Sequence, residues 1–295
     1  MKLLGEYTNG NTHVRIFDDG TKIRETKEDK FIPEFPECID LKITNYCNKN
    51  CPYCHEDSSI AGLHGDILQV PFINTLQPFT EVAIGGGNPL SHPKLATFLY
   101  KLKDLNVIAN ITINQDHFML APDLIKYLSD NKLIRGVGIS LTNSSDKELL
   151  KSIKTIPNVV IHTINGITTY EDYESLSYRG LKVLILGYKN LRRGIGYYST
   201  NVKREQRDLY MMLPFMIKDK WFDVLSFDNL ALEQLNVKGL MSEEEWNSFY
   251  MGDDGQFTMY IDLVKKEFAR SSVSEKRFKL LDNIKDMFSV QRNSD

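Results

Sequence analysis

The sequence predicts an α/β protein: a partial (β/α)6, TIM-like barrel with an N-terminal β-hairpin and a small α+β C-terminal extension. Six short runs rich in β-branched residues follow one another from residue 38 onward, and amphipathic stretches of helical period separate them. Each strand-and-helix unit spans roughly 20 to 40 residues, the length that βαβ units need. Six such units in succession favour a parallel sheet, either curled into a barrel or open and doubly wound.

The composition is that of an ordinary globular protein. The chain has 295 residues, 42% of them hydrophobic and 25% charged, which is enough to bury a large core. A formal net charge of −3 argues against general nucleic-acid binding. Residues 1–7 lack the apolar run of a signal peptide, and no stretch approaches the ~18 apolar residues of a membrane span. We therefore expect a cytoplasmic protein without a membrane segment.

The first segment is expected to be a hairpin. Val14, Ile16 and Ile23 alternate around an Asp-Asp-Gly turn at 18–20, and two prolines separate this segment from the next. We expect one compact domain with an additional segment at each end. Its expected parts are the hairpin extension at 1–37, the barrel at 38–220 and the C-terminal extension at 221–295, packed on the barrel.

The barrel elements alternate between strands and helices. The expected strands cover 39–44, 81–85, 107–114, 136–141, 159–164 and 182–186. The expected helices cover 93–105, 122–131, 147–153 and 170–177. A seventh strand is expected at 223–227, after a helix near 204–218.

The C-terminal part has a different pattern. Ser242 and Glu245 form a capping box that opens a short helix ending near Gly252. Apolar residues then alternate over 257–263, which predicts a strand with one buried face. A closing helix is expected over 275–290.

Three of the four cysteines, Cys47, Cys51 and Cys54, lie within eight residues just after the first barrel strand. The carboxyl ends of parallel strands are where α/β proteins carry their active sites. In a reducing compartment, clustered cysteines are metal ligands or redox groups more often than structural disulfides. Cys38, at the start of its strand, is expected to pack in the core.

Several chemistries compete for this cluster. A structural zinc site needs four ligands, and three thiols are present. The pattern C-x-x-C-H at 51–55 matches covalent haem attachment, and the same pair resembles a redox dithiol, but both interpretations leave Cys47 unused. An iron–sulfur cluster uses all three thiolates and leaves one iron open for a substrate or cofactor. A non-catalytic iron–sulfur or zinc protein remains the alternative of another class.

The three cysteines have the C-x3-C-x2-C spacing of the radical SAM superfamily, with the aromatic Tyr53 before the last cysteine. The segment I-G-G-G-N-P-L-S-H-P at 84–93 resembles that family's G-G-E-P-L-x-H-P turn, with Asn88 in place of the glutamate. The resemblance covers roughly 39–186. No cysteine follows Cys54, so the chain looks like a single-cluster member without a cysteine-rich C-terminal extension.

The resemblance implies a [4Fe-4S] cluster on Cys47, Cys51 and Cys54 that binds S-adenosyl-L-methionine (SAM). An electron donor such as flavodoxin or ferredoxin would reduce the cluster, and reductive cleavage would give a 5′-deoxyadenosyl radical that abstracts hydrogen from the substrate. Glycines in the turn would let the backbone approach the cofactor closely. The residues expected to hold the cofactor are Tyr53, Gly86, Gly87, Asn88, Asn114, Ser140, Asn165, Gly187 and Tyr188.

The substrate side gives fewer signals. His55, Glu56, Lys189 and Asp228 lie near predicted strand ends and are expected to face the substrate. The substrate is expected to be a peptide or protein side chain, with 257–263 offering a strand edge to an extended peptide, or else a nucleotide or small metabolite. The resemblance does not name the reaction, because one such site serves many chemistries.

Overall fold

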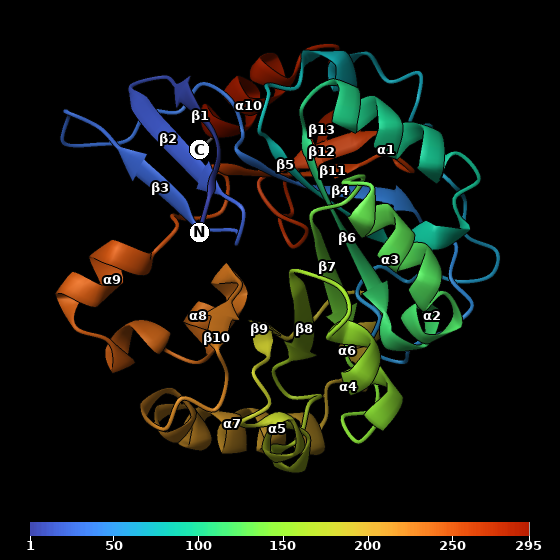
Figure 1. Cartoon of the computed structure of the whole chain (residues 1–295), viewed down its shortest axis with the longest axis vertical. Coiled ribbons are helices and arrows are strands. Elements are labelled where there is room, and N and C mark those ends of the chain that lie inside the picture. Colours follow the sequence, from blue (N-terminus) through green and yellow to red (C-terminus); the bar gives the residue numbers. More distant parts are fainter. Residues whose placement is uncertain (295) are drawn as a thin grey trace.

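A ten-stranded sheet forms the centre of the molecule (Figure 1). The structure is a computed structural model, and it describes residues 1–294. The strands are β4 (Cys38–Thr44), β5 (Glu81–Gly86), β6 (Ile108–Asn114), β7 (Gly136–Ser140), β8 (Val159–Ile164), β9 (Lys182–Leu186), β10 (Val224–Phe227), β11 (Thr258–Asp262), β12 (Glu267–Ala269) and β13 (Phe278–Lys279). Their order is β10-β9-β8-β7-β6-β5-β4-β11-β12-β13, and all neighbours from β10 to β11 are parallel.

This sheet confirms the predicted α/β class and partial barrel. All six expected barrel strands are present, and β10 is the expected seventh. Strands β10 and β13 end the order on either side, and no pairing joins them within residues 1–294, so the barrel is not closed. Alternation along β4 has a direct consequence for the site: Leu41 and Ile43 lie in the core, whereas Asp40 and Lys42 line the interior cavity.

Helices cover the outer face of the parallel strands. The longer ones are α1 (Leu95–Asp104), α3 (Pro122–Asp130), α4 (Lys147–Ile153), α5 (Tyr170–Leu176) and α7 (Thr200–Lys218), and the shorter ones are α2 (Gln115–Leu120) and α6 (Arg193–Tyr197). Side chains cap the amino ends of several helices: Asp146 caps α4, and Thr169 forms a capping box with Asp172 at the start of α5. Helix α7 begins earlier than expected because Ser199 caps it.

The N-terminal segment is a three-stranded antiparallel sheet of β1 (Leu3–Asn9), β2 (Thr12–Phe17) and β3 (Lys22–Glu25). The predicted hairpin is its β2–β3 pair, and β1 was not predicted. The hairpin tip reaches the amino ends of β8 and β9. There Asn158 Nδ2 donates to Asp18 O over 3.1 Å, and Lys182 Nζ donates to Asp19 O over 3.5 Å. The tip thereby covers the end of the barrel opposite the cysteines.

The C-terminal segment joins the central sheet. Strand β11 lies between β4 and β12, so both of its edges are paired and the expected free edge for a peptide was wrong. The expected helix over 275–290 was wrong in its first half, because Phe278 pairs with Phe268 as part of β13, and α10 (Ile284–Arg292) begins only after its cap Asn283. The remaining helices are α8 (Asn229–Gln234), α9 (Glu243–Phe249) and the 3-10 turns at Pro71–Thr75, Pro89–Ser91 and Val237–Leu240. Within the described chain, no helix has the length and apolarity to cross a membrane.

Candidate active site

A cavity of about 880 Å³ occupies the interior of the partial barrel. Its wall includes the three clustered cysteines and the turn after β5, and it extends down to the tip of the N-terminal hairpin. Most residues expected from the sequence to form the site share this one wall. They are Cys47, Cys51, Tyr53, Cys54, His55, Glu56, Gly86, Gly87, Asn114, Ser140, Gly187, Tyr188, Lys189 and Asp228.

The cysteines sit on a loop that leaves β4 and folds back on itself. Cys47 N donates to Ser59 O over 2.9 Å, and Cys54 N donates to Cys51 O over 3.2 Å. All three thiols are free and half-buried. Burial, followed by the charges of Cys54 and Cys47, raises the pKa of the Cys51 thiol. Three thiolates this close repel one another, so a positively charged metal group would stabilise them together.

Cys38 is separate from these three. It is the first residue of β4, so the length of the strand lies between it and the cysteine loop. Its Sγ lies 3.6 Å from Glu81 Oε2, and burial raises the pKa of this thiol to about 12. The residue is only partly buried and lies outside the hydrophobic core cluster, which differs from the expected packing in the core.

The glycine turn after β5 packs against the chain that leads into the cysteine loop. Gly87 N donates to Thr44 O over 2.8 Å, and Asn88 N donates to Tyr46 O over 2.7 Å. A Cβ at Gly86 would overlap Thr44 O, one at Gly87 would overlap Tyr46 O, and Gly86 has φ of +112°. The glycines are thus required for the close approach of two backbone segments.

Two expected cofactor residues do not reach the cavity. The Asn88 side chain accepts from Leu90 N over 3.2 Å and caps the turn Pro89–Ser91, outside the lining residues. Asn165 is buried, its Nδ2 donates to Gln234 Oε1 over 3.0 Å, and it is also absent from the wall. Asn88 is therefore used by a local cap two residues away, whereas Asn165 has a partner 69 positions away in the chain.

The other strand ends are partly occupied by local contacts. Asn114 and Ser140 are register partners on β6 and β7, and Asn114 Oδ1 accepts from Asp116 N over 2.9 Å. Gly187 N donates to Asp228 Oδ1 over 2.8 Å, and Tyr188 N donates to Gln234 Oε1 over 2.9 Å. The backbone amides at 187 and 188 are therefore bound within the protein, and Asp228 also caps α8.

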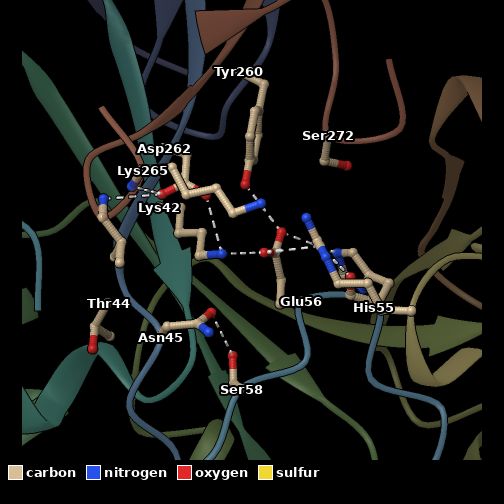
Figure 2. Close-up of polar contacts among 12 residues, drawn as sticks. Lys42, Thr44, Asn45, His55, Glu56, Ser58, Tyr260, Asp262, Lys265 and Ser272 are labelled. Carbon is tan, nitrogen blue, oxygen red and sulfur yellow. Dashed lines mark hydrogen bonds and ion pairs between the residues drawn. The ribbon is translucent and has the colours of Figure 1, made fainter. Parts of the chain in front are cut away.

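A buried charge network stands beside the cysteine loop (Figure 2). Glu56 Oε2 lies 2.5 Å from Lys42 Nζ, and Glu56 Oε1 accepts from the Tyr260 hydroxyl over 3.1 Å. Lys42 Nζ also lies 3.1 Å from Asp262 Oδ2, and Arg192 Nη1 lies 3.5 Å from Glu56 Oε2. Two strands and two loops meet here, which places the chain after Cys54 firmly against β4 and β11.

The pKa values of two nearby side chains are shifted by burial and by neighbouring charges. Burial, followed by the charges of Lys189, Arg192 and Lys42, lowers the pKa of His55 well below its usual value, so the ring is neutral at neutral pH. Burial and then Glu56 raise the pKa of Tyr260, which keeps its hydroxyl protonated. Lys189 Nζ donates to Ser272 Oγ over 2.9 Å.

Sequence reasoning missed three of these residues: Lys42, Tyr260 and Asp262. The available signal was a charged residue inside an apolar strand, as with Lys42 between Leu41 and Ile43. Such a residue is buried only when it is paired, and its partners lie far away in the sequence.

Comparison with known proteins finds one family model and several structures of similar fold. Residues 41–176 match the family model of the Radical SAM superfamily. Streptococcus suis SuiB bound to its precursor peptide SuiA aligns with a TM-score of 0.58 and 13% identity, covering 89% of this chain and 66% of SuiB. SuiB bound to S-adenosylmethionine aligns with a TM-score of 0.58 and 14% identity, over 89% and 67% of the two chains.

A second protein has the same fold. The native anSMEcpe with bound AdoMet and Cp18Cys peptide aligns with a TM-score of 0.53 and 11% identity, over 88% of this chain and 80% of anSMEcpe. This chain spans about two thirds of the length of SuiB. No curated protein sequence matches it. The match identifies residues 41–176 as a Radical SAM superfamily domain, and the alignments show that the chain shares the fold of SuiB and anSMEcpe.

Proposed function

We propose that this enzyme holds one [4Fe-4S] cluster on Cys47, Cys51 and Cys54, binds SAM beside it, and modifies a peptide. The observation that carries the proposal is the placement of three free thiols and a glycine turn on the wall of one cavity. Bound together, the cluster and SAM supply a one-electron reductive cleavage whose 5′-deoxyadenosyl radical takes hydrogen from an unactivated C–H bond.

The donor set fits a cluster better than a single ion. Within residues 1–294, no three His, Cys, Asp or Glu side chains converge on one point. A zinc ion needs four donors around one centre, whereas a cubane takes one thiolate on each of several irons. Burial and the neighbouring thiols raise the pKa of Cys51, so metal binding at this thiol would release a proton.

In this proposal the glycine turn offers carbonyl oxygens to the cofactor. The amides of Gly87 and Asn88 already donate to Thr44 and Tyr46, so they are not available to it. Carbonyl oxygens accept hydrogen bonds from an ammonium group, and the methionyl moiety of SAM carries one. Ser140 lines the cavity, and its hydroxyl has no hydrogen-bond partner in the described chain, so it offers a further polar contact.

The peptide substrate is the finer part of the proposal. SuiB and anSMEcpe, which share this fold, are structures with a bound precursor peptide and a bound Cp18Cys peptide. A cavity of about 880 Å³ lies within the range of roughly 300–1,000 Å³ for ligand pockets. It is lined near the cysteines by His55, Glu56, Lys189 and Asp228, which we propose face the substrate. An electron donor such as flavodoxin or ferredoxin and a cytoplasmic location belong to the same proposal, since thiolate ligands need a reducing compartment.

The test is 5′-deoxyadenosine formation. Protein reconstituted anaerobically with iron and sulfide would be given SAM and dithionite, and the product would be quantified by mass spectrometry. We expect product from the wild type and from Cys38→Ala, and none from Cys51→Ala. Product from Cys51→Ala at the wild-type rate would contradict the ligand assignment. A wild type that binds zinc or a cluster without cleaving SAM would favour a non-catalytic metal protein.

A further inference from the structure

Two consecutive arginines reach across from the β9–α6 connection to the cysteine loop. We name Arg192 and Arg193 the arginine clamp. Arg193 Nη2 donates to Ser58 O over 2.6 Å, and Arg193 Nη1 donates to Asn50 Oδ1. Its Nε lies 3.1 Å from Asp57 Oδ1 but is not aligned for a hydrogen bond. One guanidinium thus joins the residue before Cys51 to the chain beyond Cys54.

Arg192 contacts the same loop at the two residues after Cys54. Its Nη1 donates to His55 O and lies 3.5 Å from Glu56 Oε2. The backbone of Arg192 has φ of 47° and ψ of −119°, a conformation that is strained for a residue with a side chain. Such strain persists only where the surroundings hold it, and here the contacts of two guanidinium groups do so.

The remaining anchors of the loop are also protein groups. His117 Nε2 lies 2.7 Å from Asn48 Oδ1, and Lys42 holds Glu56. Together with the clamp, these contacts flank each cysteine on at least one side. None of them involves a thiol, so the loop is shaped by the protein alone.

The clamp also ties the loop to the opposite wall of the cavity. Tyr188, on the same connection, donates its hydroxyl to Gly194 O over 2.7 Å. A Cβ at Gly194 would overlap Lys189 O, so this connection is tightly folded. Movement of the cysteine loop would therefore displace the wall that carries Gly187 and Tyr188.

We propose that Arg192 and Arg193 are positioning residues that hold the cysteine loop in its ligating shape before metal arrives, and that the Arg193 charge raises the reduction potential of the bound cluster. This inference rests on the proposed function. Reduction adds one negative charge to a cluster, and a nearby cation favours the reduced form. Arg193 is suited to this because its side chain is only 23% exposed.

The first test uses metal-free protein and hydrogen exchange followed by mass spectrometry. We expect slow exchange of peptides covering 45–59 in the wild type and at least tenfold faster exchange there in Arg193→Gln. The exposed Arg207, 71% exposed and paired with its neighbour Asp208, supplies the control Arg207→Gln, which should exchange as the wild type does. Fast exchange in the wild-type loop, or unchanged exchange in Arg193→Gln, would overturn the positioning role.

The second test separates charge from shape. The midpoint potential of the reconstituted cluster would be measured by redox titration with electron paramagnetic resonance. Arg193→Gln should shift the midpoint potential to a more negative value. Arg193→Lys keeps the positive charge but loses the bidentate guanidinium group, so its midpoint potential should equal that of the wild type. Equal potentials in Gln and wild-type proteins would overturn the electrostatic role. If Arg193→Gln fails to fold, as judged by exchange throughout the sheet, Arg193→Lys still decides: its loop must exchange faster than wild type at an unchanged potential.

The experiments distinguish a failure of the proposed function from a failure of the arginine clamp. A wild type that assembles no cluster would remove the function, while the exchange result in metal-free protein would still stand or fall by itself. A cluster that forms normally and cleaves SAM, with a loop unaffected by Arg193→Gln, would refute this inference alone.

Discussion

Replacing Lys42 by methionine should destabilise the protein strongly. Lys42 is 3% exposed, and its Nζ lies 2.5 Å from Glu56 and 3.1 Å from Asp262. Removing one partner of a buried ion pair costs about 3–5 kcal/mol, because the remaining charge stays buried. Glu56 would keep Arg192 at 3.5 Å, and Asp262 would keep its backbone amide donors at 2.9 and 3.0 Å. We therefore expect a loss near the lower limit, about 3 kcal/mol.

The assay is urea unfolding of the metal-free, reduced protein, followed by tryptophan fluorescence. The matched control is Lys126→Met, which removes an exposed pair with Asp130 and should cost less than about 1 kcal/mol. The double variant Lys42→Met/Glu56→Gln should lose less than the sum of its single variants, with a coupling of about 0.5–3 kcal/mol. A loss under about 1 kcal/mol for Lys42→Met, or strict additivity, would show that the network does not contribute as described.

Three further predictions concern single positions. Gly87→Ala should lower the urea midpoint and the iron content after reconstitution, because its Cβ would overlap Tyr46 O, whereas Gly196→Ala, with open space around it, should not; equal losses would contradict this. Iodoacetamide at pH 8 should label the three loop cysteines of metal-free protein well before Cys38, whose pKa of about 12 leaves little thiolate, and peptide mass spectrometry reads the order. Burial lowers the pKa of His162 from 6.5 to about 4, so its neutral form favours the folded state above pH 6.5 and that stability is lost as the pH falls toward 4. His162→Gln should reduce the difference in urea midpoint between pH 7 and pH 5, and an unchanged difference would contradict the shift.

Local patterns were sufficient for much of the fold. The six barrel strands are short runs rich in β-branched residues. Such runs are typical of parallel strands that are buried on both faces, so each strand could be predicted from its own residues. Strand β1 was missed because its residues 3–7 do not alternate cleanly. The helix expected over 275–290 failed at its start because Phe278 finds a cross-strand partner in Phe268, a long-range pairing that outweighs helical periodicity.

The residues of the site also form two groups: those that a contiguous motif predicts, and those that only the fold brings together. The cysteine spacing and the glycine turn are contiguous motifs, so the sequence alone pointed to them. Asn88 and Asn165 were expected in the cavity, but Asn88 caps the turn that follows it, and Asn165 has a partner, Gln234, that only the fold brings near. Tyr260 was missed for the same reason, since its partner Glu56 lies 204 positions away in the chain, and the contact of Arg193 with Ser58 spans 135 positions.

The insertion of β11 beside β4 has a consequence for how the protein is made. The neighbour of the first barrel strand comes from residues 258–262, which are synthesised more than 200 residues after β4. Until then β4 lacks one of its two partners, and Lys42 and Glu56 lack Asp262 and Tyr260. Pairings so distant in sequence form late, because closing a long loop is slow. The cysteine loop is thus only partly anchored until β11 has joined the sheet beside β4.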